Sequence, residues 1–445
     1  AGNYGVLAAL LSQRARAPVR VCLDRREEHL AVGNRPGSRQ EVSLGAGRDG
    51  KLSAIVVTGF GAGGAGAGAG FAGPAQNLYA CPNIYTEESD VFTHSGPLAA
   101  FRAPGHPQGA FALEQSMDEL AERLGIDPLE LRERNDPHPA RQLERRRGAE
   151  AFGWSRRHAA GKGPPEGGGG ALRRGMGVAQ GLWYHLVNMD SHAEVRIHRG
   201  GAVELLCGVQ DIGGGVRTPL AQVVAEELGL DAAAVKVHLG DSRLPPGPAS
   251  GGSVTTNSIT PAARDAAHGA RRALLAEVAA ALGRKAEELS MGPGGEVRVG
   301  GPKPQTLSFK QATARMRRET VRGVGERLPD YGGFQNEARG GRGVGRGQLG
   351  GVQFAEVVVD TATGVVRVER VLAAQDCGRP INPLLVESQV RGGVIQGVSY
   401  ALFEERRMDR RTGQVLNGNL EQYKIAGALD VPRIDIALIE ELHGR

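Results

Sequence analysis

The chain has 445 residues, of which 40% are hydrophobic and only 4% aromatic, and its formal net charge is +5. This length exceeds what one ordinary hydrophobic core organises, so we expect two or more domains. The modest charge and the scarcity of aromatic rings argue against a nucleic-acid-binding protein, and no apolar run is long enough to span a bilayer. We interpret the basic run 141–147 as a solvated surface.

Helices dominate the prediction for the first third of the chain. Residues 4–15 have the apolar spacing of a packed helix, and residues 19–23 alternate like a strand. The low-complexity stretch 61–74 is typical of a flexible loop. Residues 109–124 form a helix with a glycine stop, and Asp127 then caps a second helix. The side chains expected to pack the first helix are Val6, Leu7, Leu10 and Leu11.

Strands and helices are mixed in the rest of the chain. The predicted elements are a hairpin at 193–206, a helix opened by Thr218-Pro219 and closed by Gly229, a strand at 235–239, a helix opened by Thr260-Pro261 that ends near Gly283, a helix capped by Ser308, a hairpin at 354–374, a helix at 384–405 and a strand at 434–439. This pattern predicts an α+β, multi-domain fold. We divide it into residues 1–150, a polar linker at 151–172, and residues 173–445.

The four cysteines, Cys22, Cys81, Cys207 and Cys377, each stand alone in the sequence. Without a CxxC pair, no local motif binds zinc or an iron–sulfur cluster. Isolated cysteines of this kind are typical of buried, small apolar residues. Their presence favours a reducing compartment.

Three small-residue loops each run into a predicted helix N-terminus, at residues 101–105, 210–215 and 250–257. Exposed N–H groups at the positive end of a helix bind anions, and glycine lets a flat ligand lie against the backbone. One such loop is usually a plain turn, but three in one chain predict a large, phosphate-bearing ligand. The sequence has no HExxH, GxxxxGK(S/T) or GxSxG motif, and His185 and His192 are typical of surface or core histidines rather than of a metal pair.

The last predicted helix carries glycines in its interior. Gln389 and Gln396 lie seven residues apart on one face of it. The glycines beside them are Gly392, Gly393 and Gly397. Each interior glycine costs a helix about 1 kcal/mol against alanine, which indicates the close approach of a ligand or of another backbone. Close helix packing is the alternative interpretation.

Together these motifs resemble the large subunit of the molybdenum hydroxylases, the xanthine dehydrogenase and aldehyde oxidoreductase family, in order and over nearly the whole chain. The segments that carry the resemblance are Phe101-Arg102-Ala103-Pro104-Gly105 with the helix up to Ala121, the capped helix 125–132 with Asn135, the loops 210–218 and 251–257, and residues 376–383 leading to Gln389. The variant is most similar to bacterial periplasmic-type aldehyde oxidoreductases.

The resemblance implies a molybdenum–molybdopterin cofactor, which in bacteria is usually the cytosine dinucleotide. It implies that the cofactor is contacted by Phe101, Arg102, Ala103, Gln210, Gly213, Gly214, Gly215, Gly252, Ser253, Val254, Thr255, Thr256, Asn257 and Gln389, with no side chain ligating the metal. The implied reaction is hydroxylation of an aldehyde or N-heterocycle with oxygen derived from water. Electrons then leave through 2Fe–2S and FAD centres, which implies an iron–sulfur subunit and an FAD subunit as partners.

The sequence departs from the family's pattern in three places. The family's general base is a glutamate in a Gly-Glu-Pro segment, which this chain lacks and which we expect beyond Arg445. The glycine-rich cofactor loop expected before Ala1 is also missing, and Gly214 stands where relatives often carry glutamine or threonine. We therefore expect a fragment that lacks both ends and is inactive alone. The cysteine-bearing loop of carbon monoxide dehydrogenases is not found near Phe101, which disfavours that activity.

Two other interpretations compete with this one. A degenerate or split subunit that binds the cofactor or assists assembly without chemistry is favoured by the missing glutamate. A nucleic-acid binder would use the glycine- and arginine-rich loop at 336–350, which the composition disfavours. We expect the protein in the cytoplasm, and a leader on a partner subunit would instead direct the complex to the periplasm.

Overall fold

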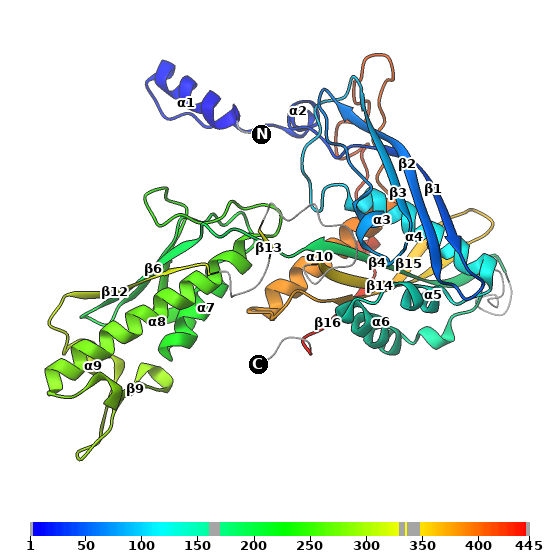
Figure 1. Cartoon of the computed structure of the whole chain (residues 1–445). Helices are drawn as coiled ribbons and strands as arrows, with labels where there is room; N and C mark the ends of the chain where they lie inside the picture. Colours follow the sequence, from blue (N-terminus) through cyan, green and yellow to red (C-terminus); the bar gives the residue numbers. More distant parts are fainter. Residues whose placement is uncertain (1–2, 160–169, 329–333, 336–347, 442–445) are drawn as a thin grey trace. The chain divides into compact units, whose positions relative to one another are not determined.

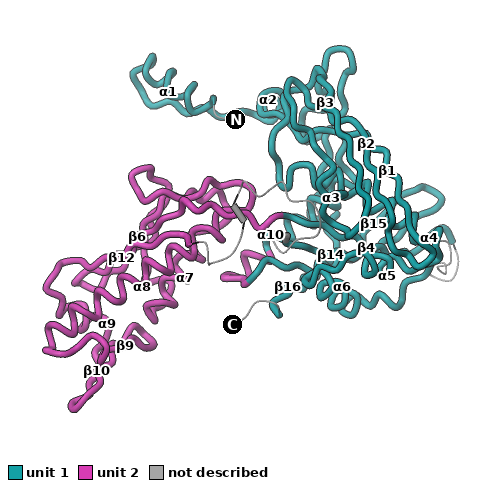
Figure 2. Tube along the Cα trace, in the orientation of Figure 1, with its two compact units in different colours: residues 1–183, 342–378, 388–445 teal, residues 184–341, 379–387 magenta. Residues whose placement is uncertain are grey.

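The computed structural model describes residues 3–159, 170–328, 334–335 and 348–441, and it mixes helices and sheets as the α+β prediction requires (Figure 1). The chain divides into two compact units. Unit 1 comprises residues 1–183, 342–378 and 388–445, and unit 2 comprises residues 184–341 and 379–387 (Figure 2). Most of the glycine- and arginine-rich loop at 336–350 lies outside the described residues, as do residues 160–169 of the expected linker.

Unit 1 contains two sheets. One has the strand order β1-β2-β3 and the other the order β16-β15-β14-β4. Helix α4 packs against β1, and α6 packs against β14 (Figure 1). The elements are α1 (Asn3–Ala15), α2 (Arg25–Ala31), β1 (Ser38–Ala46), β2 (Leu52–Gly64), α3 (Gly73–Asn77), β3 (Ile84–Phe92), α4 (His106–Leu124), α5 (Pro128–Asn135), α6 (Pro139–Phe152), β4 (Leu172–Tyr184), β14 (Gln348–Asp360), β15 (Val366–Gln375) and β16 (Arg433–Leu438). Helix α10 (Pro383–Leu402) begins in unit 2 and continues in unit 1.

An aromatic cluster forms the core between α6 and the four-stranded sheet of unit 1. The ring of Phe354 lies 5.5 Å from that of Phe152 and 5.6 Å from that of Trp154, centroid to centroid. A Cβ atom on Gly148 would lie 2.4 Å from the Phe354 ring. Glycine at this position therefore lets the ring fit beneath the helix.

Unit 2 is built on a four-stranded sheet of order β12-β6-β7-β8. Helices α7 and α8 pack against this sheet and against each other. The elements are β5 (Leu186–Val187), β6 (His192–His198), β7 (Val203–Leu206), α7 (Arg217–Leu228), β8 (Val235–His238), α8 (Thr255–Leu282), β9 (Leu289–Met291), β10 (Val297–Val299), β11 (Gln305–Leu307), α9 (Phe309–Thr313), β12 (Thr320–Glu326) and β13 (Phe334–Gln335). The small strands β11-β10-β9 form a separate sheet.

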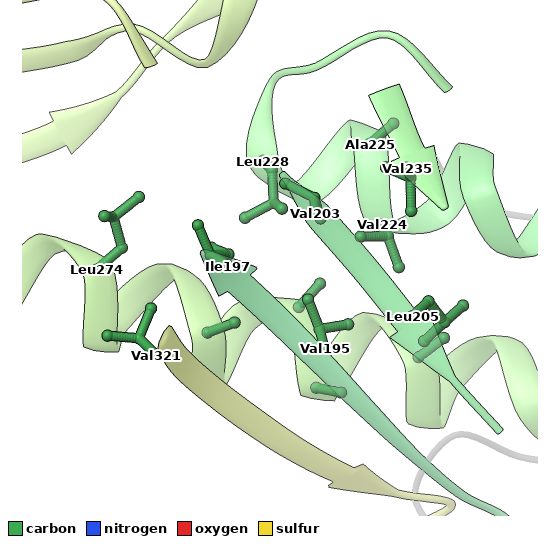
Figure 3. Close-up of a cluster of buried hydrophobic side chains, with 14 of the residues drawn as sticks. Val195, Ile197, Val203, Leu205, Val224, Ala225, Leu228, Val235, Leu274 and Val321 are labelled. Atoms are coloured by element: carbon green, nitrogen blue, oxygen red, sulfur yellow. The ribbon is translucent and has the colours of Figure 1, made fainter. Parts of the chain in front are cut away.

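Alternate residues of the strands build the core of unit 2. Val195 and Ile197 from β6, together with Leu205 from β7, point toward the helices and are fully buried (Figure 3). The facing side of α8 is rich in alanine, and its residues 262, 263, 266, 267 and 270 are all inaccessible to solvent. Small side chains on the helix therefore allow a close helix–sheet approach.

Many sequence predictions for the elements are confirmed. The helix that ends at Gly125 and the one capped by Asp127 are present, and the Asp127 carboxylate accepts the Leu129 backbone N–H at 2.8 Å. Both predicted hairpins are found as β6–β7 and β14–β15. The capping box at Ser308 is also present. These elements are specified by local turn and capping residues, which act within a few residues of each other.

Several predictions near the N-terminus were wrong. The first helix exists, but its four apolar side chains are exposed, so the expected packing is not found within the described chain. Residues 19–23 form no strand, because no neighbouring strand pairs with them. The segment 61–74 is not a flexible loop: it contains the end of β2, and Phe71 within it is 2% exposed.

Two further corrections concern helices. Helix α8 begins at Thr255, five residues before the predicted start, and Pro261 lies inside it. Proline there leaves one carbonyl without its helical donor, which the long helix tolerates. The basic run 141–147 is not uniformly solvated, because Arg141 and Arg145 are fully buried in α6. Of the four cysteines only Cys207 is buried. No described helix is both long and apolar enough to cross a membrane.

Candidate functional site

The first predicted loop forms a tight turn before α4. Ala103 adopts φ 57° and Gly105 adopts φ 78°, both in the left-handed region. The N–H of His106 donates to the Ala103 carbonyl at 3.1 Å. A left-handed alanine is uncommon and costs conformational energy, so surrounding contacts must hold it.

The glycine-rich segment of residues 61–74 packs directly against this turn. A Cβ on Gly105 would lie 2.4 Å from the Gly70 carbonyl oxygen, and one on Gly109 would lie 1.9 Å from the Phe71 carbonyl oxygen. The segment is held by carboxylates of β3: Asp90 accepts the Ala69 N–H at 2.9 Å, and Glu88 accepts backbone N–H groups of residues 71 and 72. Glycines at positions 105 and 109 thus bring two backbones into contact.

Arg102 and Gln389, two residues far apart in the sequence, meet in unit 1. The Arg102 guanidinium donates to the backbone carbonyl of Gln389 in α10. It also lies over Gly392 and Gly393, where Cβ atoms would come within 3.4 and 3.3 Å of its nitrogens. The helix glycines 392 and 393 are therefore approached by a side chain, whereas the sequence predicted a ligand or another backbone. A Cβ on Gly397 would meet nothing within 4 Å, so no other described part of the chain approaches that glycine.

The second and third predicted loops meet each other in unit 2. The hydroxyl of Ser250 donates to the backbone carbonyl of Gln210 at 3.0 Å and lies 3.2 Å from its side-chain oxygen. The Asp211 carboxylate accepts the N–H groups of Gly213 and Gly215, both at 3.0 Å. Sequence reasoning missed this internal cap, although aspartate two residues before a glycine is a common turn signal.

The third loop presents polar groups at the start of α8. Gly252 and Ser253 both have φ 65°, and Val254 is buried. Thr255, Thr256 and Asn257 lie in the first turn of the helix, not in the loop. The Asn257 amide nitrogen donates to the Leu186 carbonyl at 2.6 Å, while its side-chain oxygen is buried without a partner.

The segment 376–383 connects β15 to α10 and is anchored at both ends. In unit 1, the Asp376 N–H donates to the buried Glu144 carboxylate at 2.7 Å. In unit 2, the Asn382 side chain donates to Gln222 of α7 at 3.1 Å and accepts the Leu385 N–H at the start of α10. Burial raises the pKa of Glu144 to about 8. The family resemblance indicated the segment that contains Asp376 and Asn382, but the sequence did not indicate their partners Glu144 and Gln222.

The predicted site residues thus form two groups. Phe101, Arg102, Ala103 and Gln389 belong to unit 1, and Gln210, residues 213–215 and residues 252–257 belong to unit 2. Within each group the structure brings segments together that are distant in sequence. The unit 1 group offers the Arg102 guanidinium and the unit 2 group offers polar side chains, and Cβ atoms on Gly213 and Gly214 would meet nothing within 4 Å. A flat ligand rich in hydrogen-bonding atoms fits such donors and open glycines.

Comparison with known proteins identifies the family. Residues 2–136 and 147–432 match two models, both described as a molybdopterin cofactor-binding domain. The chain is 32% identical to the aldehyde oxidoreductase molybdenum-binding subunit PaoC of Escherichia coli K12, over 98% of this chain and 58% of the relative. It is 30% identical to the putative xanthine dehydrogenase molybdenum-binding subunit XdhA of the same organism, over 97% of this chain and 59% of the relative.

Solved structures agree with this assignment. Quinoline 2-oxidoreductase from Pseudomonas putida 86 superposes with a TM-score of 0.79 at 25% identity, covering 98% of this chain and 59% of that one. A Cu,Mo-CO dehydrogenase has the same fold, with a TM-score of 0.77 at 21% identity and coverage of 98% and 59%. The chain spans about three fifths of the length of the relatives it matches. It belongs to the molybdopterin cofactor-binding domain family, the family of the molybdenum-binding subunits of aldehyde oxidoreductases and xanthine dehydrogenases.

Proposed function

We propose that this chain holds the cofactor in the molybdenum-binding subunit of an oxidoreductase that hydroxylates aldehydes or N-heterocycles with oxygen derived from water. The observation that carries the proposal is the meeting of Arg102 with Gln389, because two predicted contact residues 287 positions apart converge in unit 1. The relatives that support it are named as aldehyde oxidoreductase and xanthine dehydrogenase subunits.

The cofactor we propose is the molybdenum–molybdopterin cytosine dinucleotide. When bound, it would supply the two-electron oxidation of an electron-poor carbon. Gln210 and the open glycine backbone at residues 213–215 would hold its pterin and phosphates, together with residues 252–257. The buried, unpartnered oxygen of Asn257 supports this assignment, because a buried polar atom is normally hydrogen-bonded. Such an atom can accept an N–H group of a bound ligand.

In unit 1 the chain's own contribution is a positive charge held in a fixed place. Arg102 carries five donors on a planar, positively charged fork. Its contact with the Gln389 carbonyl uses only part of that fork. The remaining donors would orient oxygen atoms of the cofactor or substrate, while Phe101 and Ala103 shape the turn that carries them.

The electrons require further carriers, for which we propose an iron–sulfur subunit and an FAD subunit as partners. The sequence contains no CxxC pair that would bind a cluster locally. The two Escherichia coli relatives are themselves named as molybdenum-binding subunits, which supports a division of the centres among chains. We propose a cytoplasmic location, in accord with four cysteines that form no disulfide.

Molybdenum and nucleotide content test the proposal. The complex carrying this chain should be purified from its native source, with molybdenum measured by plasma mass spectrometry and cytidine monophosphate measured after acid hydrolysis. We expect close to one of each per chain. Their absence from material proven to contain the intact chain would refute the proposal. A complex that contains molybdenum and the nucleotide but reduces no dye with any aldehyde or N-heterocycle would favour the alternative, a cofactor-binding subunit without catalytic activity.

A further inference from the structure

Arg35, which lies just before β1, contacts the Phe101–Ala103 turn. Its Nη2 donates to the backbone carbonyl of Arg102 at 2.7 Å. Its guanidinium carbon lies 5.0 Å from the centroid of the Phe101 ring and 5.9 Å from that of Tyr400. Both distances fall within the roughly 6 Å range of cation–π attraction. One side chain therefore contacts the turn and α10 together.

The hydrogen bond from Arg35 falls at the strained point of the turn. The Arg102 carbonyl belongs to the peptide that leads into Ala103, whose φ is 57°. A non-glycine residue in this region persists only where its surroundings over-determine it. The Nε and Nη1 atoms of Arg35 are buried without a hydrogen-bond partner. Among the described residues, the bond to the Arg102 carbonyl, the Phe101 ring, and the ring and hydroxyl of Tyr400 therefore fix this guanidinium.

Two adjacent glycines of α10 fix the position of the Arg102 side chain. The Arg102 guanidinium lies where Cβ atoms of residues 392 and 393 would otherwise approach, at 3.4 and 3.3 Å from its nitrogens. Contacts this short force a neighbour to move by a few tenths of an ångström. The two glycines thus leave a flat helix surface on which the guanidinium lies, beside the Gln389 carbonyl. They cost the helix some stability.

We propose that Arg35 and Gly393 are positioning residues for Arg102. Arg35 holds the main chain of the turn, and Gly393 leaves space on α10 for the Arg102 guanidinium. The inference rests on the proposed function, in which Arg102 meets the cofactor or substrate. Neither residue touches the reacting atoms. Their effect is to keep one charge in one place, and displacement of such a group by about 1 Å lowers catalytic rates by on the order of 100-fold.

The sharpest test compares two alanine substitutions in the same helix. Gly393→Ala places a methyl group against Arg102, whereas Gly397→Ala places one where nothing lies within 4 Å. Both changes favour the helix equally, so neither should lower the Tm of the full-length holoenzyme. We expect Gly393→Ala, which displaces the guanidinium by a few tenths of an ångström, to reduce kcat by about 3- to 10-fold, and Gly397→Ala to leave it within about twofold. Equal kcat values in the two variants would overturn the role of Gly393.

Arg35→Lys tests the main-chain half of the proposal. Lysine keeps the charge but loses the planar fork and the stacking. The control is Arg39→Lys, because the Arg39 side chain is 82% exposed and pairs with the exposed Glu41. We expect faster hydrogen exchange of amides 101–106 in Arg35→Lys alone, measured on the full-length protein by mass spectrometry. Unchanged exchange would overturn the role of Arg35.

The exchange measurement does not depend on the cofactor, so the two proposals fail separately. A wild-type protein that lacks molybdenum but shows the expected exchange difference would refute the proposed function and leave Arg35 as the residue that holds the turn. A wild-type protein that contains molybdenum, but whose variants all behave alike in exchange and kcat, would leave the function standing and overturn the positioning roles.

Discussion

The guanidinium groups of Arg141 and Arg145 are inaccessible to solvent, and both donate to the carboxylate of Asp136 at 2.6 Å. Burial alone would raise the pKa of Asp136, but the hydrogen bonds and charges of the two arginines outweigh it and hold this pKa below its usual value. The side chain of Gln180 completes the network by donating to the same carboxylate. Such a network costs little when intact, but removal of one member leaves a buried charge uncompensated.

We expect Arg145→Met to lower the free energy of unfolding by about 3–5 kcal/mol, because Asp136 then loses one of its two cationic partners. Arg147→Met in the same helix should cost less than about 1 kcal/mol, since Arg147 is 52% exposed and pairs with an exposed Glu441. Urea unfolding followed by circular dichroism measures both. Equal losses in the two variants would contradict the buried network.

Glu144 lies beside this network and behaves differently. Burial raises its pKa to about 8, and the charge of Asp376 adds to the rise, while the Asp376 N–H bond and the charges of Arg141 and Arg145 oppose it. One carboxylate oxygen accepts the Asp376 N–H, and the other is buried without a partner. The unpartnered oxygen is a suitable place for the proton. We therefore expect Glu144 to be protonated at neutral pH.

A raised pKa in the folded state makes stability depend on pH in a defined direction. The stabilisation from Glu144 is complete below its ordinary pKa of 4.5 and is lost as the pH rises through about 8. We expect the free energy of unfolding of the wild type to fall by several kcal/mol relative to Glu144→Gln over that window. Urea titrations at about pH 5 and about pH 8.5 would measure this. Exposed Glu150, changed to glutamine, should follow the wild type, and parallel pH profiles for all three proteins would exclude a proton on Glu144.

At the scale of elements, strand β12 lies directly against helix α8. A Cβ on Gly325 would lie 2.2 Å from the Ala262 carbonyl oxygen and 2.3 Å from the Ala266 nitrogen, and Gly323 is crowded in the same way. The obstacles are backbone atoms of a helix, which cannot rotate aside. The two glycines therefore let strand β12 lie directly on the backbone of α8. The small alanine side chains on this face of α8 allow the same close approach.

We expect Gly325→Ala to destabilise the fold by about 1–3 kcal/mol through overpacking, because strand and helix must separate to admit the methyl group. The matched control is Gly177→Ala in β4, where a Cβ would meet nothing within 4 Å. That change should leave stability the same or slightly higher. The midpoints of urea unfolding compare the two variants, and a Gly325→Ala protein as stable as the wild type would show that β12 does not lie on α8.

The glycine-rich segment 61–74 shows why composition misleads at this scale. Its sequence is typical of a flexible loop, yet carboxylates from β3 accept its N–H groups and the N-terminal turn of α4 packs on it. Asp90 and Glu88 lie 16 to 22 residues away from the amides that they accept. No local pattern in the segment reveals those partners, so order here is a tertiary effect.

At the scale of the whole molecule, predictions succeeded where the signal was local. Gly125, Asp127 and Ser308 fix helix ends through bonds to near neighbours, and these ends were predicted correctly. The buried face of α6 was missed because Arg141 and Arg145 give no apolar period, although they lie four residues apart on one helical face. The family resemblance supplied the contact residues, whereas Arg35 and Asp211 emerged only from three-dimensional contacts.

Each unit also has a core of its own, which allows a prediction about cooperativity. The buried apolar cluster of unit 2 includes Val195 and Leu205, and that of unit 1 includes Phe152 and Phe354. Loss of packing in one cluster removes no side chain from the other. We therefore expect the two units to respond separately to a substitution that affects only one core.

Gly325→Ala in the whole chain tests this expectation. Because the added methyl group disturbs α8 and β12, both in unit 2, we expect β6 amides to lose protection from hydrogen exchange at a lower urea concentration than in the wild type. The amides of β14 in unit 1 should keep their wild-type urea midpoint. Exchange measured by mass spectrometry at increasing urea follows both strands in one sample. A shared downward shift of β6 and β14 would mean that the chain unfolds as one cooperative body despite its two cores.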